Sequence, residues 1–242
     1  MPQIEYHIKV VQDRIKRAAL IAGTNPSSIR LIAVSKKKPV DMIREAFQAG
    51  LMEFGENRVQ EAKQKYDVLG NTVSWHLIGP LQTNKVRHAV HLFDMIQSVD
   101  RLSLAEALHK RLAPLEKKMP VLIQVKTSDE ESKSGIEPDR TIAFIEQLIS
   151  FPTLSVQGLM TIPAYSDDPD DARPAFSRLR TLQEQIASSG LPGVTMDILS
   201  MGMSHDFEVA IECGANIVRI GTALFGENGE AKKTDSTTTA SM

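Results

Sequence analysis

The stretch Leu31-Ile32-Ala33-Val34-Ser35-Lys36 is an apolar run of strand length that ends in a lysine. Its short length and its apolar and β-branched residues are typical of a β-strand. The next segment, Val40–Ala49, has a helical pattern. This part of the sequence therefore predicts one β-strand followed by one α-helix.

The same order of strand and helix repeats along the chain. We expect eight short strands, at Arg30–Lys36, Met52–Gly55, Ser74–Gly79, Met95–Val99, Pro120–Thr127, Leu154–Thr161, Thr195–Ser200 and Asn216–Ile220. Helical patterns lie at Val40–Ala49, Arg58–Leu69, Leu102–Leu115, Asp139–Ile149, Ala172–Ser188 and Phe207–Cys213. Asp100 and Ser204 are candidate N-caps. Eight such units in roughly 200 residues favour a closed (β/α)8 barrel over an open doubly wound sheet.

Two segments fall outside this repeat. Before it, apolar residues from Ile4 to Ile21 recur at helical spacing and predict an extra amphipathic helix that ends near Gly23. After it, Gly226–Met242 is rich in Glu, Lys, Ser and Thr and is too polar to join a core. We expect a single domain over residues 1–226 and a disordered tail over residues 227–242.

Composition limits the classes of function. The chain of 242 residues has 28 basic and 30 acidic side chains and a net charge of −2, so it offers no basic face for nucleic acid. The single cysteine, Cys213, cannot form an internal disulfide, which is typical of a reducing compartment. No apolar signal core and no membrane-spanning run are evident. We therefore expect a cytoplasmic protein with no nucleic-acid or membrane partner.

Lys36 is the first candidate site residue. In a barrel of this kind, functional groups gather at the carboxyl ends of the strands, where Lys36 lies. A neutral lysine amine can condense with an aldehyde to form a Schiff base. A solvated lysine in a basic loop is the alternative, because Lys37 and Lys38 follow. Lys36 is favoured among the three because it alternates with Ile32 and Val34 toward one side of the strand.

The last two strands end in segments suited to a phosphate. Such a ligand needs backbone N–H donors in turns that allow close approach, which favours Gly, Ser and Thr. Ser200–Ser204 follows the seventh strand, and Gly221 and Thr222 follow the eighth. Arg219 could pair with the phosphate or face a cofactor ring, or it could be a structural arginine. An amine that binds aldehydes, together with two phosphate candidates, suggests pyridoxal phosphate.

Asn57 and His76 fall at the ends of the second and third strands and could line the same pocket. The alternatives are a helix cap for Asn57 and a packed, hydrogen-bonded structural role for His76. A metal site is poorly supported, because the acidic run Asp129–Glu131 lies in a loop that looks solvated. A Schiff-base aldolase remains possible, although its lysine usually lies farther along such a barrel.

From about Ile4 to Gly226 the chain resembles the pyridoxal-phosphate homeostasis protein family, the single-domain relatives of the alanine racemase N-terminal barrel. The shared motifs occur in family order: Val34-Ser35-Lys36, Phe54-Gly55-Glu56-Asn57, Trp75-His76-Leu77-Ile78-Gly79-Pro80-Leu81-Gln82, Ser132-Lys133-Ser134-Gly135, Gly158-Leu159-Met160, Leu199-Ser200-Met201-Gly202-Met203-Ser204 and Arg219-Ile220-Gly221-Thr222. The resemblance implies a (β/α)8 TIM barrel of PLP fold type III.

The resemblance also implies roles for the candidate residues. Lys36 would form the covalent aldimine, Arg219 would lie at the cofactor, and Asn57 and His76 would line the pocket. The residues implied to hold the phosphate are Ser200, Gly221 and Thr222. The chain departs from the family pattern at Arg58, where an aromatic residue is expected, and at Lys37, where a small polar one is common. The second departure makes Lys37 a conceivable secondary adduct site.

The racemase completes its site with a second domain and a tyrosine, and no residue of this chain can be assigned the tyrosine's role from sequence. A cofactor held without an opposed acid/base pair can exchange but should be a poor catalyst. We therefore expect a monomeric, non-catalytic protein that buffers pyridoxal phosphate or delivers it to apo-enzymes, and so balances vitamin B6 and amino-acid pools. The alternatives are a racemase or related enzyme of narrow specificity, and a structural barrel that binds no cofactor.

Overall fold

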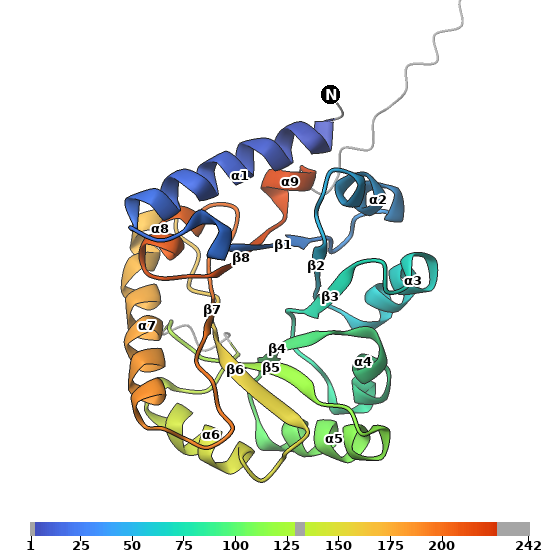
Figure 1. The fold of residues 1–242 in the computed structure, drawn as a ribbon, viewed down its shortest axis with the longest axis vertical. Coiled ribbons are helices and arrows are strands. Elements are labelled where there is room, and N and C mark those ends of the chain that lie inside the picture. The colour runs from blue at the N-terminus through green and yellow to red at the C-terminus, as the bar shows by residue number, and fades with distance from the viewer. Residues whose placement is uncertain (1–2, 129–133, 227–242) are drawn as a thin grey trace, which may run out of the picture.

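The computed structural model describes residues 3–128 and 134–226. The predicted tail over 227–242, the acidic run Asp129–Glu131, and Ser132 and Lys133 of the fourth family motif lie outside the described residues. Eight parallel strands form one closed barrel in sequence order, and helices surround it (Figure 1). The predicted barrel is confirmed.

The strands are short and follow the predicted order. They are β1 (Arg30–Val34), β2 (Glu53–Glu56), β3 (Ser74–Leu77), β4 (Met95–Val99), β5 (Met119–Gln124), β6 (Leu154–Met160), β7 (Ile198–Ser200) and β8 (Ile217–Ile220). The barrel closes where β1 pairs with β8, with Ile32 opposite Arg219 and Ala33 opposite Ile220. This closure brings the first and last strand ends side by side.

The α-helices surround the strands. They are α1 (Gln3–Ile21), α2 (Val40–Gln48), α3 (Val59–Leu69), α4 (Val86–Leu92), α5 (Leu102–Leu112), α6 (Thr141–Leu148), α7 (Arg173–Ser188), α8 (Phe207–Glu212) and α9 (Thr222–Phe225). The sequence patterns did not predict α4 and α9. These helices have seven and four residues, too few for apolar periodicity to distinguish a helix from a loop.

Several predicted boundaries are wrong by a few residues. β1 ends at Val34, two residues before Lys36, because the chain enters a turn in which Lys37 has a φ of 60°, outside the extended region. β7 begins at Ile198, although Thr195 was expected to start it. The helix predicted to reach Leu115 ends at Leu112 and gives way to a 3-10 turn, Ala113–Leu115, in which Pro114 has no N–H to donate.

Both predicted N-caps are also wrong. The N-caps of α5 and α8 are Arg101 and Asp206, and neither makes a side-chain capping bond. The Asp100 carboxylate instead pairs with Arg101, with 2.6 Å between Nη1 and Oδ1. The Ser204 hydroxyl instead accepts the N–H groups of Gly221 and Ala223, at 3.3 Å each. Tertiary partners have taken over both side chains.

The predicted extra helix, α1, covers the seam where the barrel closes. It lies across β8 and β1 and packs against α8, α9 and α2 (Figure 1). Its buried face consists of Ile4, Ile8, Val11, Ile15, Ala18 and Ala19. Because α9 has only four residues, α1 fills the place in the outer ring that a full helix after β8 would occupy.

The apolar core has two parts. The larger part lies between the strands and the helices. A smaller cluster fills the barrel interior and comprises Ile32, Met95, Leu122, Met160, Ile198 and Ile217. Its members show which strand positions face inward, and Ser200 and Arg219 lie two residues after Ile198 and Ile217, so they face inward too. No helix among the described residues is long and apolar enough to cross a membrane.

Candidate functional site

Lys36 lies at the carboxyl end of the barrel, in the turn after β1. Ile32 of the inner cluster lies on β1, but the strand ends at Val34, so the inward side expected for Lys36 stays a prediction. The side chain is exposed, and no hydrogen bond or ion pair within residues 3–128 and 134–226 engages its amine. By contrast, the Lys38 amine donates to the carbonyls of Phe225 and Gly226, at 3.3 and 2.8 Å. An accessible amine therefore stands where the sequence predicts one.

The end of β8 lies directly beside this turn. Gly221 is so close to β1 that a Cβ there would lie 3.4 Å from the Val34 Cβ and carbonyl oxygen. Thr222 is exposed, and its N–H has no acceptor among the described residues. Barrel closure thus brings two of the predicted phosphate residues, Gly221 and Thr222, next to the end of β1, which leads into the Lys36 turn.

Gly202 shapes the neighbouring loop after β7. Its φ of 91° lies in the left-handed region, and a Cβ there would lie 2.6 Å from the Ala210 Cβ. Only glycine fits both demands. The loop can therefore turn back tightly, and Ser204 reaches the start of α9.

Arg219 lies inside the barrel, with 3% of its surface exposed. Its guanidinium donates to the Ser200 hydroxyl at 2.6 Å and to the Thr161 carbonyl at 2.7 Å. Burial lowers the pKa of Arg219 to about 10, opposed by the charge of Asp206, so the group remains a cation at neutral pH. The structure thus places a fixed positive charge below the open face of the barrel.

Ser200 is fully buried at the end of β7. Its hydroxyl accepts from Arg219 and donates to Gln97 Oε1 at 2.6 Å. Both of these bonds run within the barrel interior. A predicted phosphate residue therefore has its hydroxyl committed to protein partners.

His76 is also buried, with 1% of its surface exposed, and it extends the same hydrogen-bonded chain. Because Gln97 Oε1 accepts from Ser200, the Gln97 amide N–H is free to donate to His76 Nδ1, at 3.1 Å. This assignment leaves the ring proton on Nε2, which lies 3.3 Å from Glu53 Oε2. His76 therefore makes the contacts of a packed, hydrogen-bonded interior histidine, which was the structural alternative for this residue.

Glu53 ends this chain at the opposite, amino-terminal end of the barrel. Burial by itself would raise the pKa of Glu53, but hydrogen bonds from His76 and Arg30 outweigh it and lower the pKa to about 2. Five side chains thus form one directed chain through the barrel, from Arg219 through Ser200, Gln97 and His76 to Glu53. Sequence analysis missed Gln97, although a glutamine within the apolar strand Met95–Val99 was a usable signal.

Asn57 directly follows β2 and is half-buried. The pairing of β1 with β2 ends at Val34 and Gly55, two residues before Lys36 and Asn57. The alternative of a helix cap is wrong, because the N-cap of α3 is Arg58. Asn57 also lines a groove of 710 Å³, together with Arg58, Val59, Gln60, Pro80, Gln82 and Lys85. Asn57 therefore faces a surface opening between the segments that follow β2 and β3.

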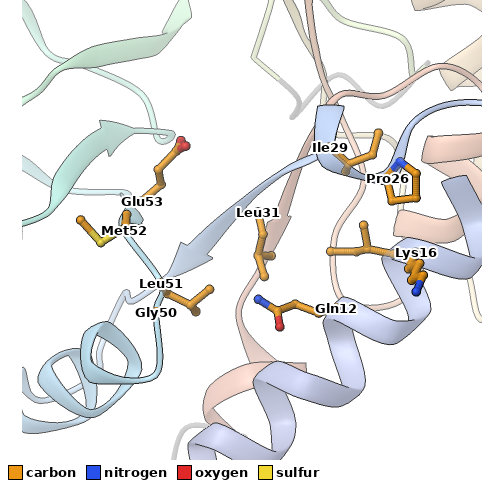
Figure 2. Close-up of a pocket in the computed structure, with 10 residues that line it drawn as sticks. Gln12, Lys16, Pro26, Ile29, Leu31, Gly50, Leu51, Met52 and Glu53 are labelled. Carbon is orange, nitrogen blue, oxygen red and sulfur yellow. The ribbon is translucent and has the colours of Figure 1, made fainter.

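A second pocket lies at the other end of β1 and β2 (Figure 2). It measures 340 Å³ and lies between α1 and the first residues of the two strands. Glu53, Leu31 and Gln12 are among its lining residues, and none of the predicted site residues is. Within the described part of the chain, no group of three or more His, Cys, Asp or Glu residues could hold a metal ion. The carboxyl end of the barrel therefore remains the candidate site.

The fold and the position of this site define a class of protein, the barrels that resemble the N-terminal domain of alanine racemase. The model of that family, described as alanine racemase, N-terminal domain, matches residues 7–229. A pyridoxal phosphate homeostasis protein of Aquifex aeolicus is 45% identical over 218 residues, which are 90% of this chain and 95% of the relative. The chain belongs to the pyridoxal phosphate homeostasis protein family.

Solved structures agree with this assignment. PipY of Synechococcus elongatus, solved with PLP bound, is 38% identical and has a TM-score of 0.77. The match covers 88% of this chain and 100% of PipY. An alanine racemase of Clostridium difficile shares the fold, with a TM-score of 0.74 at 14% identity. That match covers 96% of this chain and 58% of the racemase.

Proposed function

We propose that this protein binds pyridoxal phosphate at the carboxyl end of its barrel and serves to buffer or deliver the cofactor inside the cell. The observation that carries the proposal is the accessible, unengaged amine of Lys36 beside the end of β8. Its relatives are named as pyridoxal phosphate homeostasis proteins, and PipY was solved with PLP bound. These names support the same ligand for this chain.

The residues present fit that ligand. When bound, pyridoxal phosphate supplies an aldehyde, and Lys36 is proposed to hold it as a Schiff base, with one water released for each C=N bond formed. The unengaged N–H of Thr222 would donate to the phosphate, Gly221 would allow its close approach to the backbone, and Ser200 lies at the end of the neighbouring β7. Arg219 supplies a fixed cation, and Asn57 follows the end of β2 as Lys36 follows the end of the neighbouring β1. His76 would act through Gln97 and Ser200, which connect it to Arg219.

We propose a binding protein in preference to an enzyme. Reaction at the α-carbon of an amino acid needs a positioned acid/base partner. Tyr6 and Tyr165 are exposed, at 58% and 75%, and the Tyr165 hydroxyl bonds Asp167 in its own loop. Tyr66 lies on α3, packed against the outer core. These positions support weak residual chemistry at most, and the alternative of a narrow racemase predicts exchange of an amino-acid α-proton in deuterated water.

The first test is the absorbance spectrum of the purified protein after incubation with pyridoxal phosphate, before and after borohydride reduction. We expect a visible band that disappears on reduction, with the pyridoxyl mass on Lys36. The variant Lys36→Ala should lose the band and remain folded, because the side chain is exposed and makes no bond among the described residues. Lys37→Ala is the matched control and should keep the band. A wild-type protein that stays colourless would contradict the proposal.

The cellular part of the proposal concerns recipients and location. We propose that the protein is cytoplasmic and passes the cofactor to PLP-dependent apo-enzymes. Mixing the loaded protein with an apo-enzyme tests this. The activity of the enzyme should rise faster than in a control that contains the same amount of free pyridoxal phosphate and an unrelated protein. Equal rates would count against delivery and leave buffering as the role.

A further inference from the structure

A cluster of charged side chains lies behind the Lys36 turn, on the outward side of β2. Glu56 shares the strand face of Phe54, which belongs to the outer core, so its carboxylate points toward α3 and is fully buried. Lys65 of α3 meets it, with 2.6 Å between Nζ and Glu56 Oε1. The same amine lies 2.7 Å from Glu61 Oε1. The Lys65 side chain is only 5% exposed, so this is an interior ion cluster.

The cluster holds both neighbours of Lys36. Lys65 Nζ donates to the Ser35 carbonyl at 2.6 Å, and the Ser35 hydroxyl donates to Glu56 Oε1 at 2.6 Å. On the other side, the backbone N–H of Lys37 donates to the Glu61 carboxylate. The residues before and after Lys36 are therefore fixed, while its own amine is left free.

The backbone of the turn needs this support. Lys37 has a φ of 60°, in the left-handed region that costs a non-glycine residue about 1 kcal/mol or more. The turn is closed by the Lys38 N–H, which donates to the Ser35 carbonyl at 3.0 Å. Ser35 and Lys37 are the two residues that the cluster binds, so it stabilises the conformation of the turn that carries Lys36.

Stability alone does not account for the cluster. A buried ion pair is often no more stable than apolar residues of the same volume. Burial raises the pKa of Glu56, although Lys65 and the Ser35 hydroxyl oppose that rise, and Glu56 Oε2 finds no hydrogen-bond partner in the described part of the chain. Beyond packing, the charged groups provide the hydrogen bonds to Ser35 and Lys37 of the turn.

We propose that Glu56, Lys65 and Glu61 are positioning residues that select Lys36, and not Lys37 or Lys38, as the amine that reacts with pyridoxal phosphate. This inference rests on the proposed function. In the reaction, the amine adds to the aldehyde carbon and one water leaves, so no oxidant or reductant is needed. The cluster acts by holding the backbone on both sides of the reacting residue.

The test compares where the cofactor becomes attached. Wild type, Lys65→Met and Glu61→Ala are incubated with pyridoxal phosphate, reduced with borohydride, and mapped by peptide mass. We expect wild type to carry the pyridoxyl group on Lys36. In both variants the ratio of Lys37 adduct to Lys36 adduct should rise about tenfold, and the visible band should form about tenfold more slowly, since misplacement of a reacting group by about 1 Å can cost up to a hundredfold.

Helix α3 supplies matched controls. Lys63 and Asp67 form an exposed ion pair on the same helix, with 2.6 Å between Lys63 Nζ and Asp67 Oδ2. Lys63→Met and Asp67→Ala therefore make the same chemical changes without a contact to the turn, and should leave the adduct on Lys36. Glu61→Gln keeps an oxygen that can accept the Lys37 N–H, so it should restore much of the wild-type ratio. A role in stability alone would not produce this order.

The outcomes separate the two proposals. If wild type is modified at Lys36 and both Lys65→Met and Glu61→Ala show the wild-type ratio, the positioning role is overturned and the proposed function stands. If wild type carries no adduct at Lys36, the proposed function falls and the inference falls with it. The Glu61 side chain is 23% exposed, so Glu61→Ala should stay folded even if Lys65→Met does not.

Discussion

At the scale of single residues, burial separates the candidate site residues into two groups. Lys36 and Thr222 are exposed and Asn57 and Gly221 are half-buried at the open face, whereas Ser200, Arg219 and His76 lie inside the barrel with 3% exposure or less. The first group can touch a ligand directly. The second group forms a hydrogen-bonded chain whose buried polar atoms satisfy one another.

Arg219→Met tests the buried cation. The change removes the donors to the Ser200 hydroxyl and the Thr161 carbonyl and leaves those two groups short of partners. We expect a loss of about 2 to 4 kcal/mol in the free energy of unfolding, measured by urea denaturation. The control is Arg173→Met, whose ion pairs are on the surface with the side chain 43% exposed, and it should cost about 1 kcal/mol or less. Similar losses for the two variants would contradict the interior role.

Glu53 predicts a dependence of stability on pH. Its pKa in the folded state, about 2, lies below the ordinary value of 4.5, so the ionised form stabilises the fold. This contribution, about 3 kcal/mol at most, is fully present above about pH 5 and is lost as the pH falls toward 2. Glu53→Gln should therefore be less stable than wild type at pH 7, and the gap should narrow at pH 3. A gap of equal size at both values would refute the assignment, and the exposed Asp67→Asn serves as control.

At the scale of elements, α1 is an integral part of the barrel. Besides its apolar face, Arg14 forms two bonds of 2.7 Å with Glu208 of α8, and its guanidinium lies 4.6 Å from the centre of the Phe207 ring. His7 Nδ1 lies 3.0 Å from the Leu224 carbonyl oxygen of α9. These contacts join the first helix to the last two helices, so the closing seam depends on α1.

The two faces of α1 should respond differently to truncation. Ile8 is 2% exposed, and Ile8→Ala should lower the free energy of unfolding by about 2 to 4 kcal/mol, since it leaves a cavity against the seam. Leu20 on the same helix is 61% exposed, and Leu20→Ala should change that energy by about 0.5 kcal/mol or less. Thermal and urea denaturation measure both. Equal effects would mean that α1 does not pack as described.

At the scale of the whole molecule, the described residues already form a closed barrel, which has no free sheet edge to pair with another chain. Of the large apolar side chains that remain exposed, Tyr6, Val10, Leu20 and Ile21 lie on α1, and Met52, Val68, Leu115, Ile149 and Tyr165 come from separate parts of the chain. Exposed apolar residues that are scattered singly, as in the second group, are ordinary on monomeric proteins. These observations support the expectation of a monomer.

Light scattering on the eluting protein tests that expectation. We expect a mass near the 26.7 kDa of one chain, with no change when the protein is diluted tenfold. The same result should hold after loading with pyridoxal phosphate, since every residue proposed to hold the ligand comes from one chain. A mass of two chains, or one that depends on concentration, would contradict the expectation.

The sequence by itself determined the order of the eight strands, the barrel class, the extra first helix and the place of Lys36 at the carboxyl end of the first strand. These features follow from local periodicity and from motifs, which do not depend on distant parts of the chain. The ends of the strands were predicted less accurately: the first strand was expected to reach Lys36, but β1 ends two residues earlier, at Val34.

Only the tertiary structure decided which side chains meet. Ser200 bonds Gln97, 103 residues away, and Lys65 bonds the Ser35 carbonyl, 30 residues away. Such pairs depend on the register between strands and on barrel closure, and a shift of one residue would turn each side chain to the other face. For this reason the sequence could propose His76 and Ser200 for the site, but only the fold showed that both side chains bond Gln97 inside the barrel.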